Sequence, residues 1–367
     1  MVKSIVFATL SVIATSLSAG DPFTVFEGPS ESAPRQPQAC VSEDGVAHLT
    51  FGVGDQVFYC QVNGPSKLEP QVVFRIPNMS LGMRRGPRIA HSGKSIVITA
   101  IGGVEGKGKD GDILAYHSDD NGKTWIGPSR VNDVESSARE GLHAMTASSE
   151  GILWCVWLDL REKGTQIFAS KSSDQGRTWS KNVHVYRSPD GSVCECCHPS
   201  IVATRNSLHV LFRNSINGNR DMYLVSSDDG GGTFKSAVRL GQNNWQLNAC
   251  PMDGGMLALD RNQKLLTVWR RDRSVFSAEP ESISEAFIGV GEQPWIANSS
   301  DGFYTVWTSK RSGDLLLLAP GSSNSERLGS DASYPIVTSA IRSESVVYAF
   351  WEKQSGKDFS ILGKRLK

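Results

Sequence analysis

Beyond its N-terminal 20 residues, the sequence lacks an apolar run long enough to cross a bilayer, which takes about 20 residues. The nearest candidate is the short segment Leu315–Ala319. It also lacks an excess of charge, because 38 basic residues balance 38 acidic ones. A balanced charge gives no electrostatic reason to expect nucleic acid or an anionic membrane as partner. No stretch has sustained helical periodicity, and strand patterns recur with turn signals between them. We therefore expect an all-β protein with no membrane span and no nucleic-acid partner.

The N-terminus has the pattern of a secretory signal peptide. Lys3 supplies a basic start, residues 5–14 are apolar, and Leu17-Ser18-Ala19 has the pattern of a small-residue cleavage site. We expect residues 1–20 to be a signal peptide, residues 21–367 to form one domain, and the protein to be secreted or periplasmic. Export permits disulfides, yet the seven cysteines are an odd number, so at least one thiol is unpaired or liganded.

Three segments align without gaps and share the pattern Ser-x-Asp-x-Gly-x-Thr-Trp/Phe. They are His117–Trp125, Lys171–Trp179 and Ser226–Phe234. The aspartate of each copy can accept backbone N–H groups in a tight turn, the glycine can supply positive φ, and the aromatic residue can return to the hydrophobic layer. We interpret the three aspartates as turn-forming rather than catalytic: Asp120, Asp174 and Asp229.

A second repeat consists of a turn, often with proline, followed by a strand, a Gly/Asp/Ser turn and a β-branched strand. Its copies are anchored at residues 37, 87, 142, 199, 251, 294 and 335. Units of this size with several strands each are typical of propeller blades. The sequence therefore predicts a β-propeller of four-stranded blades, seven by repeat count, in which Phe23–Phe26 completes the last blade as its outer strand.

The Ser-x-Asp-x-Gly-x-Thr-Trp repeat resembles the Asp box of the sialidase-like (neuraminidase) BNR-repeat propellers. Sialidases have six blades, so six is the alternative count. The resemblance implies exo-glycoside hydrolysis of anionic, sialic-acid-like glycans. The alternatives from other classes are a non-catalytic propeller that binds carbohydrate or protein, and a metal- or haem-binding propeller.

The resemblance also implies an arginine triad that grips the carboxylate of the substrate, a task suited to the planar guanidinium group. Phe74-Arg75-Ile76-Pro77 matches the family signature literally, whereas Arg88 matches its position ahead of the first box. Arg213 resembles a second member of the triad, and Arg270 or Arg271 would be the third.

The catalytic residues implied by the resemblance are a tyrosine nucleophile, an aspartate acid/base and a glutamate that activates the tyrosine. Tyr334 matches the tyrosine, and Asp112 in Lys109–Ile113 is the candidate acid/base. Glu195 is the available glutamate, but it is displaced from the expected position. Without a neighbouring base, a phenol of pKa about 10 is a poor nucleophile at neutral pH.

The run Cys194-Glu195-Cys196-Cys197-His198 supports three interpretations. Cys194, Cys197 and His198 satisfy the c-type haem attachment pattern. Cys194, Cys196, Cys197 and His198 could instead converge with Cys250 on zinc or copper, because thiolates and imidazole suit both ions. The third interpretation, a disulfide within the run or to Cys250, is the one the sequence favours, and no cofactor is then expected.

Overall fold

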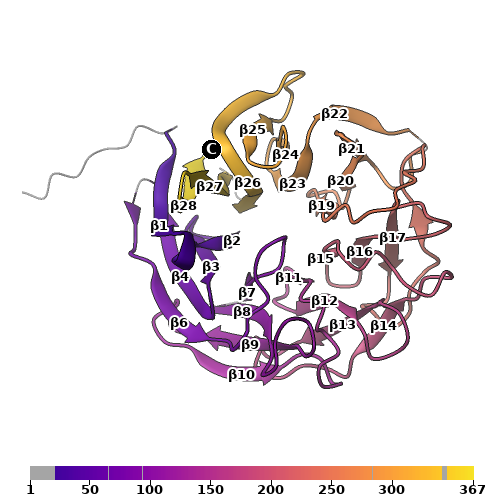
Figure 1. Cartoon of the computed structure of the whole chain (residues 1–367), viewed down its shortest axis with the longest axis horizontal. Helices are drawn as coiled ribbons and strands as arrows, with labels where there is room; N and C mark the ends of the chain where they lie inside the picture. The colour runs from indigo at the N-terminus through magenta and orange to yellow at the C-terminus, as the bar shows by residue number, and fades with distance from the viewer. Residues whose placement is uncertain (1–20, 65, 93, 283, 341–344) are drawn as a thin grey trace, which may run out of the picture.

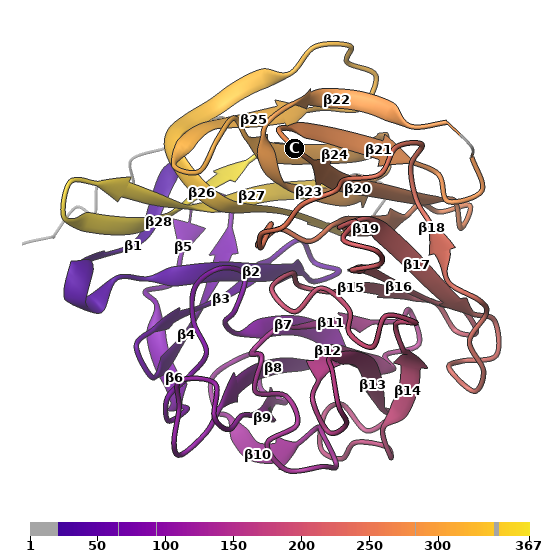
Figure 2. The same cartoon turned by 45° about the vertical axis from the view of Figure 1, so that its right-hand side comes forward.

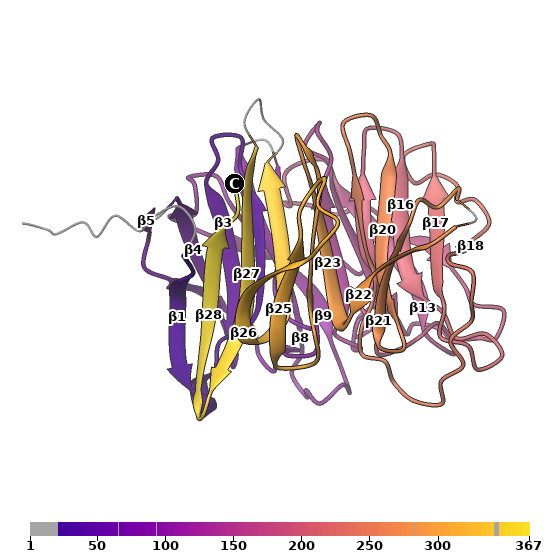
Figure 3. The ribbon, with the colours of Figure 1, turned by 90° about the horizontal axis from the view of Figure 1, so that it is seen from above.

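The protein was analysed as a computed structural model, which describes residues 21–64, 66–92, 94–282, 284–340 and 345–367. The predicted signal peptide lies outside these residues. Antiparallel sheets are arranged around a central axis (Figure 1), and in side view their strands run roughly along that axis (Figure 3). The prediction of an all-β propeller with four-stranded blades is confirmed. Among the described residues, no helix has the length and hydropathy needed to cross a membrane.

The strands of the first sheets follow one another in chain order. The first sheet comprises β2 (Arg35–Val41), β3 (Ala47–Val53), β4 (Gln56–Asn63), β5 (Ser66–Lys67) and β6 (Gln71–Arg75), the last two both pairing with β4. The second comprises β7 (Arg88–Ser92), β8 (Ser95–Gly102), β9 (Asp112–Ser118) and β10 (Ile126–Arg130). The third comprises β11 (His143–Ala147), β12 (Leu153–Asp159), β13 (Gln166–Ser172) and β14 (Val183–Tyr186).

Two further sheets repeat this order. The fourth comprises β15 (Ser200–Ala203), β16 (Leu208–Arg213), β17 (Met222–Ser227) and β18 (Val238–Arg239). The fifth comprises β19 (Met256–Leu259), β20 (Leu265–Arg271), β21 (Ser274–Ala278) and β22 (Ala286–Val290).

The last sheet has seven strands and a shared long strand. It comprises β23 (Glu292–Ser299), β24 (Gly302–Thr308), β25 (Gly313–Leu318), β26 (Glu326–Ala340), β27 (Val346–Ser355), β28 (Asp358–Arg365) and β1 (Phe23–Pro29). The first part of β26 pairs with β25 and the second part with β27, with a register shift between Ser333 and Ile336. The 3-10 helix η1 (Ser30–Ser32) connects β1 to β2.

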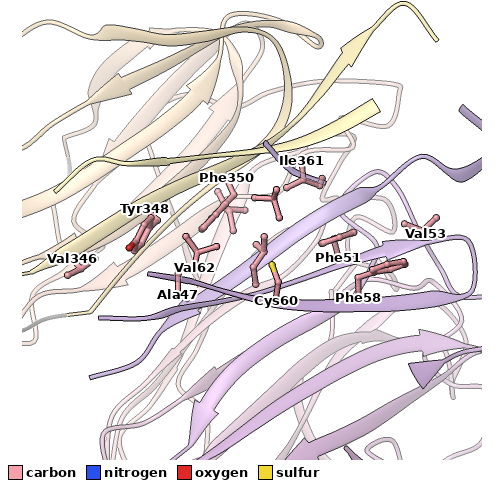
Figure 4. Close-up of a cluster of buried hydrophobic side chains, with 13 residues drawn as sticks. Ala47, Phe51, Val53, Phe58, Cys60, Val62, Val346, Tyr348, Phe350 and Ile361 are labelled. Atoms are coloured by element: carbon pink, nitrogen blue, oxygen red, sulfur yellow. The ribbon is translucent and has the colours of Figure 1, made fainter. Parts of the chain in front are cut away.

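The ring is closed by the N-terminal strand. β1 pairs antiparallel with β28, and Phe23 lies opposite Gly363, so the predicted outer strand is confirmed. One buried cluster joins the two ends of the chain: Phe51 and Phe58 from β3 and β4 pack in it with Phe350 and Ile361 from β27 and β28 (Figure 4). Each fully buried side chain of this size contributes about 1.5–3 kcal/mol.

The predicted repeat anchors mark the innermost strands. In the described part of the chain these are β2, β7, β11, β15, β19, β23 and the second part of β26, which neighbour one another around the axis (Figures 1 and 2). All seven anchors lie in such a strand or shortly before it. Because neighbouring strands within each sheet are antiparallel, the loops after the second strands share a face with the innermost-strand starts. We call this the axial face.

The three Asp boxes lie on the opposite face, because each follows the third strand of its sheet. In the first box Ser118 Oγ donates to Asp120 Oδ1 at 2.8 Å, and the Thr124 amide donates to the same oxygen at 2.8 Å. The other two boxes repeat these contacts. Gly122 has φ +82°, and a Cβ there would lie 2.2 Å from the Tyr59 ring of the preceding sheet. The boxes therefore belong to the framework, as predicted.

We expect the pairing of β1 with β28, which closes the ring, to be essential for stability. Val25 is 1% exposed within the cluster that joins the chain ends, whereas its neighbour Thr24 is exposed. Val25→Asp buries an unpaired carboxylate and should lower the free energy of unfolding by about 3–5 kcal/mol. Thr24→Asp, the matched control, should stay within about 0.5 kcal/mol. Denaturant unfolding measures the free energy of unfolding of both variants. Equal values would show that β1 does not hold the ring closed.

The Asp boxes generate a second stability prediction. Asp174→Ala removes the acceptor for Ser172 Oγ, the Thr178 amide and Thr178 Oγ1. The melting temperature should fall by roughly 2–4 °C, while Ser173→Ala, at an exposed position in the same turn, should leave it unchanged. Differential scanning calorimetry compares the two variants. An unchanged melting temperature in Asp174→Ala would show that the box does not hold the turn.

Candidate functional site on the axial face

The starts of several innermost strands share an unusual backbone feature. Gln36, Gln293 and Tyr334 each precede a proline and have φ of 58°, 60° and 50°, a left-handed conformation that costs non-glycine residues roughly 1–2 kcal/mol. Each of their buried amides donates to a side chain. The amides of Gln36 and Gln293 donate to the adjacent sheet, and that of Tyr334 donates to β23 of the same sheet. The acceptors are Glu352 Oε1 at 2.7 Å, Asp253 Oδ2 at 2.7 Å and Gln293 Oε1 at 2.7 Å, respectively.

Arg84 reaches across the axis from the hairpin between β6 and β7. It is 1% exposed and donates to Pro335 O at 3.1 Å and Gln293 O at 3.2 Å. Its guanidinium carbon lies 4.7 Å from the Trp295 ring centroid. Burial lowers the pKa of Arg84 to about 10, which the charges of Asp253 and other groups oppose. Arg84 therefore ties opposite sides of the ring together.

Arg88 and Arg213, two predicted members of the clamp, are buried and bound to backbone carbonyls. Arg88 donates to His143 O at 3.0 Å and to Gly86 and Pro87 O at 3.1 Å each. Arg213 donates to Asp253 O at 3.0 and 3.1 Å and to Arg270 O at 2.9 Å. In this structure both side chains brace neighbouring sheets, with their guanidinium groups bound to backbone carbonyls.

Of the other three predicted arginines, Arg270 lies beside Arg213, and their guanidinium carbons are 5.5 and 5.0 Å from the centroid of the Trp245 ring. Arg75, on the outer strand β6, pairs with Asp55 at 2.9 Å. Arg271 pairs with Glu285 and lies 4.1 Å from the Phe276 ring centroid. Arg270 pairs with Glu292 at 2.7 Å. Among the candidates for the triad, the structure thus places Arg213 and Arg270 side by side, whereas Arg75 and Arg271 are held by Asp55 and Glu285.

The predicted acid/base and activating residues are also separated from Tyr334. Asp112 begins β9, a third strand, and its Oδ1 accepts from Asn132 Nδ2 at 2.6 Å and from the Ser136 amide at 2.7 Å. Glu195 is exposed and accepts from Ser192 Oγ at 2.9 Å. Neither lines the cavity beside Tyr334.

Tyr334 lines a cavity of about 160 Å³ on the axial face. Its walls combine three cationic side chains with an aromatic ring and a buried carboxylate. The charged and aromatic residues of the lining are Arg35, Arg311, Lys353, Tyr334, Phe359 and Glu352. Burial raises the pKa of Tyr334, and the nearby charge of Arg311 opposes that rise.

Glu352 of β27 organises this cavity. It is 2% exposed and lies opposite Ser333, the neighbour of Tyr334, in the β26–β27 register. Its Oε2 accepts from Arg35 NH1 at 3.0 Å, and Arg35 also lies 4.0 Å from the Phe359 ring centroid. Burial raises the pKa of Glu352. A fixed guanidinium group and a buried carboxyl group therefore line the same cavity as Tyr334.

Sequence analysis missed Arg35, Arg311 and Glu352. A detectable signal existed only for Arg35, which lies two residues before the anchor Pro37 and thus at an innermost-strand start. Arg311 is in the turn between β24 and β25, and Glu352 is near the end of β27. Neither occupies a position that the repeat pattern singles out, because they reach Tyr334 through the strand pairing and turns of the last sheet, and Arg35 joins them only when the ring closes.

The predicted cysteine cluster forms in part. The Sγ atoms of Cys194, Cys196 and Cys197 lie 3.4, 3.7 and 3.9 Å apart, and the nearby Cys196 raises the pKa of Cys250. Hydrogen bonds with Cys196 and Cys197 lower the pKa of Cys194, whereas burial raises that of Cys197. All seven cysteines are free. The disulfide favoured by the sequence is not formed, because the sulfurs are grouped nearly equidistantly instead of paired at about 2.05 Å.

His198 does not belong to that cluster. Its ring stacks on Trp295 with a centroid separation of 5.9 Å, and its Nδ1 accepts from the Gly254 amide at 3.3 Å. The residue therefore faces the axis and Gly254, rather than serving beside the thiols as a haem or metal ligand. The Cys-x-x-Cys-His pattern is thus divided between two different environments.

A larger cavity of about 380 Å³ lies on the opposite face, between the fourth and fifth sheets. Its walls carry ion pairs of both signs, Lys235 with Asp228 and Lys264 with Glu279. These pairs compensate both lysines, so the walls offer no excess of cationic groups to an anionic ligand. The smaller axial-face cavity is the better candidate site.

The buried histidines of the axial face predict a pH dependence of stability. Burial, and secondarily the charge of Arg88, lowers the pKa of His143 well below its ordinary value, so the folded protein keeps this ring neutral. The unfolded chain binds a proton below about pH 6.5. The stability contributed by neutral His143 is therefore present above pH 6.5 and is lost as the pH falls toward the lower folded pKa.

His143→Gln should reduce the slope of unfolding free energy against pH by about 1 kcal/mol per pH unit between pH 6 and 5. Denaturant unfolding at a series of pH values measures this slope. Above pH 7.5 the curves of the wild type and the variant should run parallel, which is the internal control. Identical slopes below pH 6 would show that His143 is protonated in the folded state.

Comparisons with known proteins agree with this architecture. Residues 86–339 match the family described as BNR repeat-like domain. No curated protein sequence gives a significant match. Similar solved structures include a Penicillium chrysogenum alpha-L-arabinanase complexed with arabinobiose (TM-score 0.54, 13% identity, 95% of this chain and 99% of that one). An ulvan lyase bound to a GlcA-containing ligand has a TM-score of 0.57 at 10% identity, covering 91% and 94% of the two chains.

A Hadza microbial sialidase is also similar, with a TM-score of 0.52 and 14% identity over 92% of this chain and 66% of that one. At these identities the solved structures establish a shared fold and nothing finer. The fold is thus one that glycoside hydrolases and a polysaccharide lyase also use. The family match covers more than half of the sequence and includes all three Asp boxes. The chain belongs to the BNR repeat-like domain family.

Proposed function

We propose that this protein binds the terminal acidic sugar of a glycan in the axial-face cavity beside Tyr334 and hydrolyses its glycosidic bond. The observation that carries the proposal is the combination, in one cavity, of Tyr334, buried Glu352 and three cationic side chains. The similar structures that include a sialidase and a lyase bound to a GlcA-containing ligand support a glycan as the ligand class.

The charge of the cavity supports an anionic ligand. Arg35 is held by Glu352 and Phe359, so its guanidinium orientation is fixed before a ligand arrives. Arg311 is exposed, and Lys353 is partly exposed. A volume of about 160 Å³ is below the roughly 300 Å³ at the lower end of sites for drug-sized ligands. It suits a single terminal sugar unit, and hence exo-action.

Tyr334 would be the nucleophile: its oxygen would bond to the anomeric carbon as the bond to the aglycone breaks, and Glu352 would take up the phenolic proton. The departing oxygen would take a proton from water, and a second water would then release the sugar from Tyr334. Burial disfavours the phenolate of Tyr334, so a base is required. A carboxyl group with a raised pKa is the better proton acceptor of the two carboxylate candidates, because Glu195 is remote. An anionic sugar would also repel a carboxylate nucleophile and favour a phenol.

A non-catalytic glycan-binding propeller is the second candidate. The observation that favours it is that both carboxylate oxygens of Glu352 already accept hydrogen bonds. Oε1 accepts from the amide and side chain of Gln36, and Oε2 accepts from Arg35. These contacts stabilise the carboxylate and oppose its role as a base. Hydrolysis and binding must therefore be measured separately.

We further propose that the ring has seven blades and that the protein is exported. The seven-blade count is supported by β26, whose two parts would serve two consecutive blades, β23–β26 and β26–β28 with β1. The six blades of sialidases would leave one innermost strand unassigned. The export proposal rests on the sequence of residues 1–20, and the N-terminal sequence of the mature protein tests it.

Tyr334→Phe should lower kcat/KM for a fluorogenic sialoside or glucuronide at least about 100-fold, because it removes the nucleophilic oxygen. Arg311→Ala should weaken binding of the free sugar acid about 5- to 10-fold, because it removes one exposed charge contact. Arg75→Ala is the matched control: this arginine lies on an outer strand and pairs with Asp55, and its variant should behave as wild type.

Hydrolysis is followed by fluorescence and binding by titration calorimetry. Binding that Arg311→Ala weakens, without turnover of either substrate, would replace the hydrolase with the binding propeller. The absence of both binding and turnover would overturn the proposal. Full activity in Tyr334→Phe would move the reaction to another site.

A further inference from the structure

We propose that Cys194, Cys196 and Cys197 form a binding site for one thiophilic d10 cation, Zn(II) or Cu(I), with Cys250 as the closing ligand. This site is independent of the glycan cavity, and the proposal does not rest on the proposed reaction. The three sulfurs come from four consecutive residues in the loop between β14 and β15, and they gather around one point on the axial face.

The distances fit a shared cation. With Zn–S bonds of about 2.3 Å, tetrahedral coordination places sulfurs roughly 3.8 Å apart. The observed Sγ separations are 3.4, 3.7 and 3.9 Å. A disulfide would use two of the three sulfurs and leave the third beside it, whereas one cation uses all three. Soft thiolate ligands select Zn(II) and Cu(I) over oxygen-preferring ions.

The loop is held in place before any ion binds. The Val193 amide donates to Thr165 O at 2.9 Å, and the Cys194 amide donates to Arg213 O at 3.0 Å. Cys194 and Cys197 are buried, and Cys196 is partly buried. A site preorganised in this way loses little conformational entropy on binding.

Cys250 supplies a fourth thiol from a different loop. It lies between β18 and β19, is exposed, and is near enough to Cys196 for that thiol to raise the pKa of Cys250. Coordination by Cys250 would connect the loop before β15 to the loop before β19, and so tie the fourth and fifth sheets together. Each thiol that binds releases its proton to solvent.

The surrounding charge suits a thiolate site. Arg213 and Arg220 act electrostatically on the cluster. Four thiolates around Zn(II) carry a net charge of minus two, which two guanidinium groups balance. Glu195, inside the Cys194–Cys197 run, is exposed and bonded to Ser192, so it does not add a buried negative charge.

The test is metal content of the full chain after anaerobic reduction. Zinc is measured by mass spectrometry after dialysis, and Cu(I) by competition with a chromogenic chelator. We expect one ion per chain in the wild type and in Cys155→Ser, the control in a distant buried thiol of β12. The double variant Cys194→Ser/Cys197→Ser should retain less than about a tenth of that. Cys250→Ser should bind with affinity at least about tenfold lower.

A second readout and a second variant keep the test decisive. Removal of the ion by chelator should lower the melting temperature of the wild type by several degrees and leave that of the double variant unchanged. If the double variant does not fold, Cys196→Ser, at the partly buried position, replaces it and should lose metal. The proposal is overturned if the reduced wild type takes up neither ion, or if metal content survives the loss of Cys194 and Cys197 or of Cys196. The proposal is also overturned if two of these cysteines form a disulfide and its reduction does not lead to metal binding.

Discussion

The structure depends on the way the buried amides at the innermost-strand starts are satisfied. Gln36, Gln293 and Tyr334 adopt left-handed φ ahead of proline, which removes their N–H groups from the strand ladder. A buried amide without an acceptor costs about 1–3 kcal/mol, so each must find one on another innermost strand or on a neighbouring sheet. Glu352, Asp253 and Gln293 supply these acceptors. The axial contacts therefore set the angular position of one blade relative to the next.

This requirement explains why so many charged groups are buried near the axis. Arg84, Arg88 and Arg213 donate to backbone carbonyls of other sheets, and their burial is compensated by those contacts. Arginine at a propeller axis is therefore not by itself evidence of a ligand clamp. The distinction comes from the partners: a guanidinium group bound to carbonyls is part of the frame, whereas Arg311 is exposed at a cavity.

The axial face carries two chemically different sites on one frame. The Tyr334 cavity lies between the first and last parts of the chain, where β2, β26, β27 and β28 meet. The thiol cluster lies on the loop before β15, with Cys250 on the loop before β19. Both positions are loops or strand ends at the face where the innermost strands begin. The opposite face is occupied by the Asp boxes, whose side chains are consumed by their own turns.

The sequence by itself determined the repeat, and hence the fold. The Asp boxes, the anchors and the outer strand Phe23–Phe26 are local patterns, and each depends on hydrogen bonds or packing within a few residues or within one strand. The site was beyond local patterns: Arg88 and Arg213 matched a motif but braced the frame, and Glu352 had no motif at all. Only ring closure, which pairs β1 with β28, decided that Arg35 and Glu352 meet beside Tyr334, because contacts separated by some 300 residues depend on tertiary geometry.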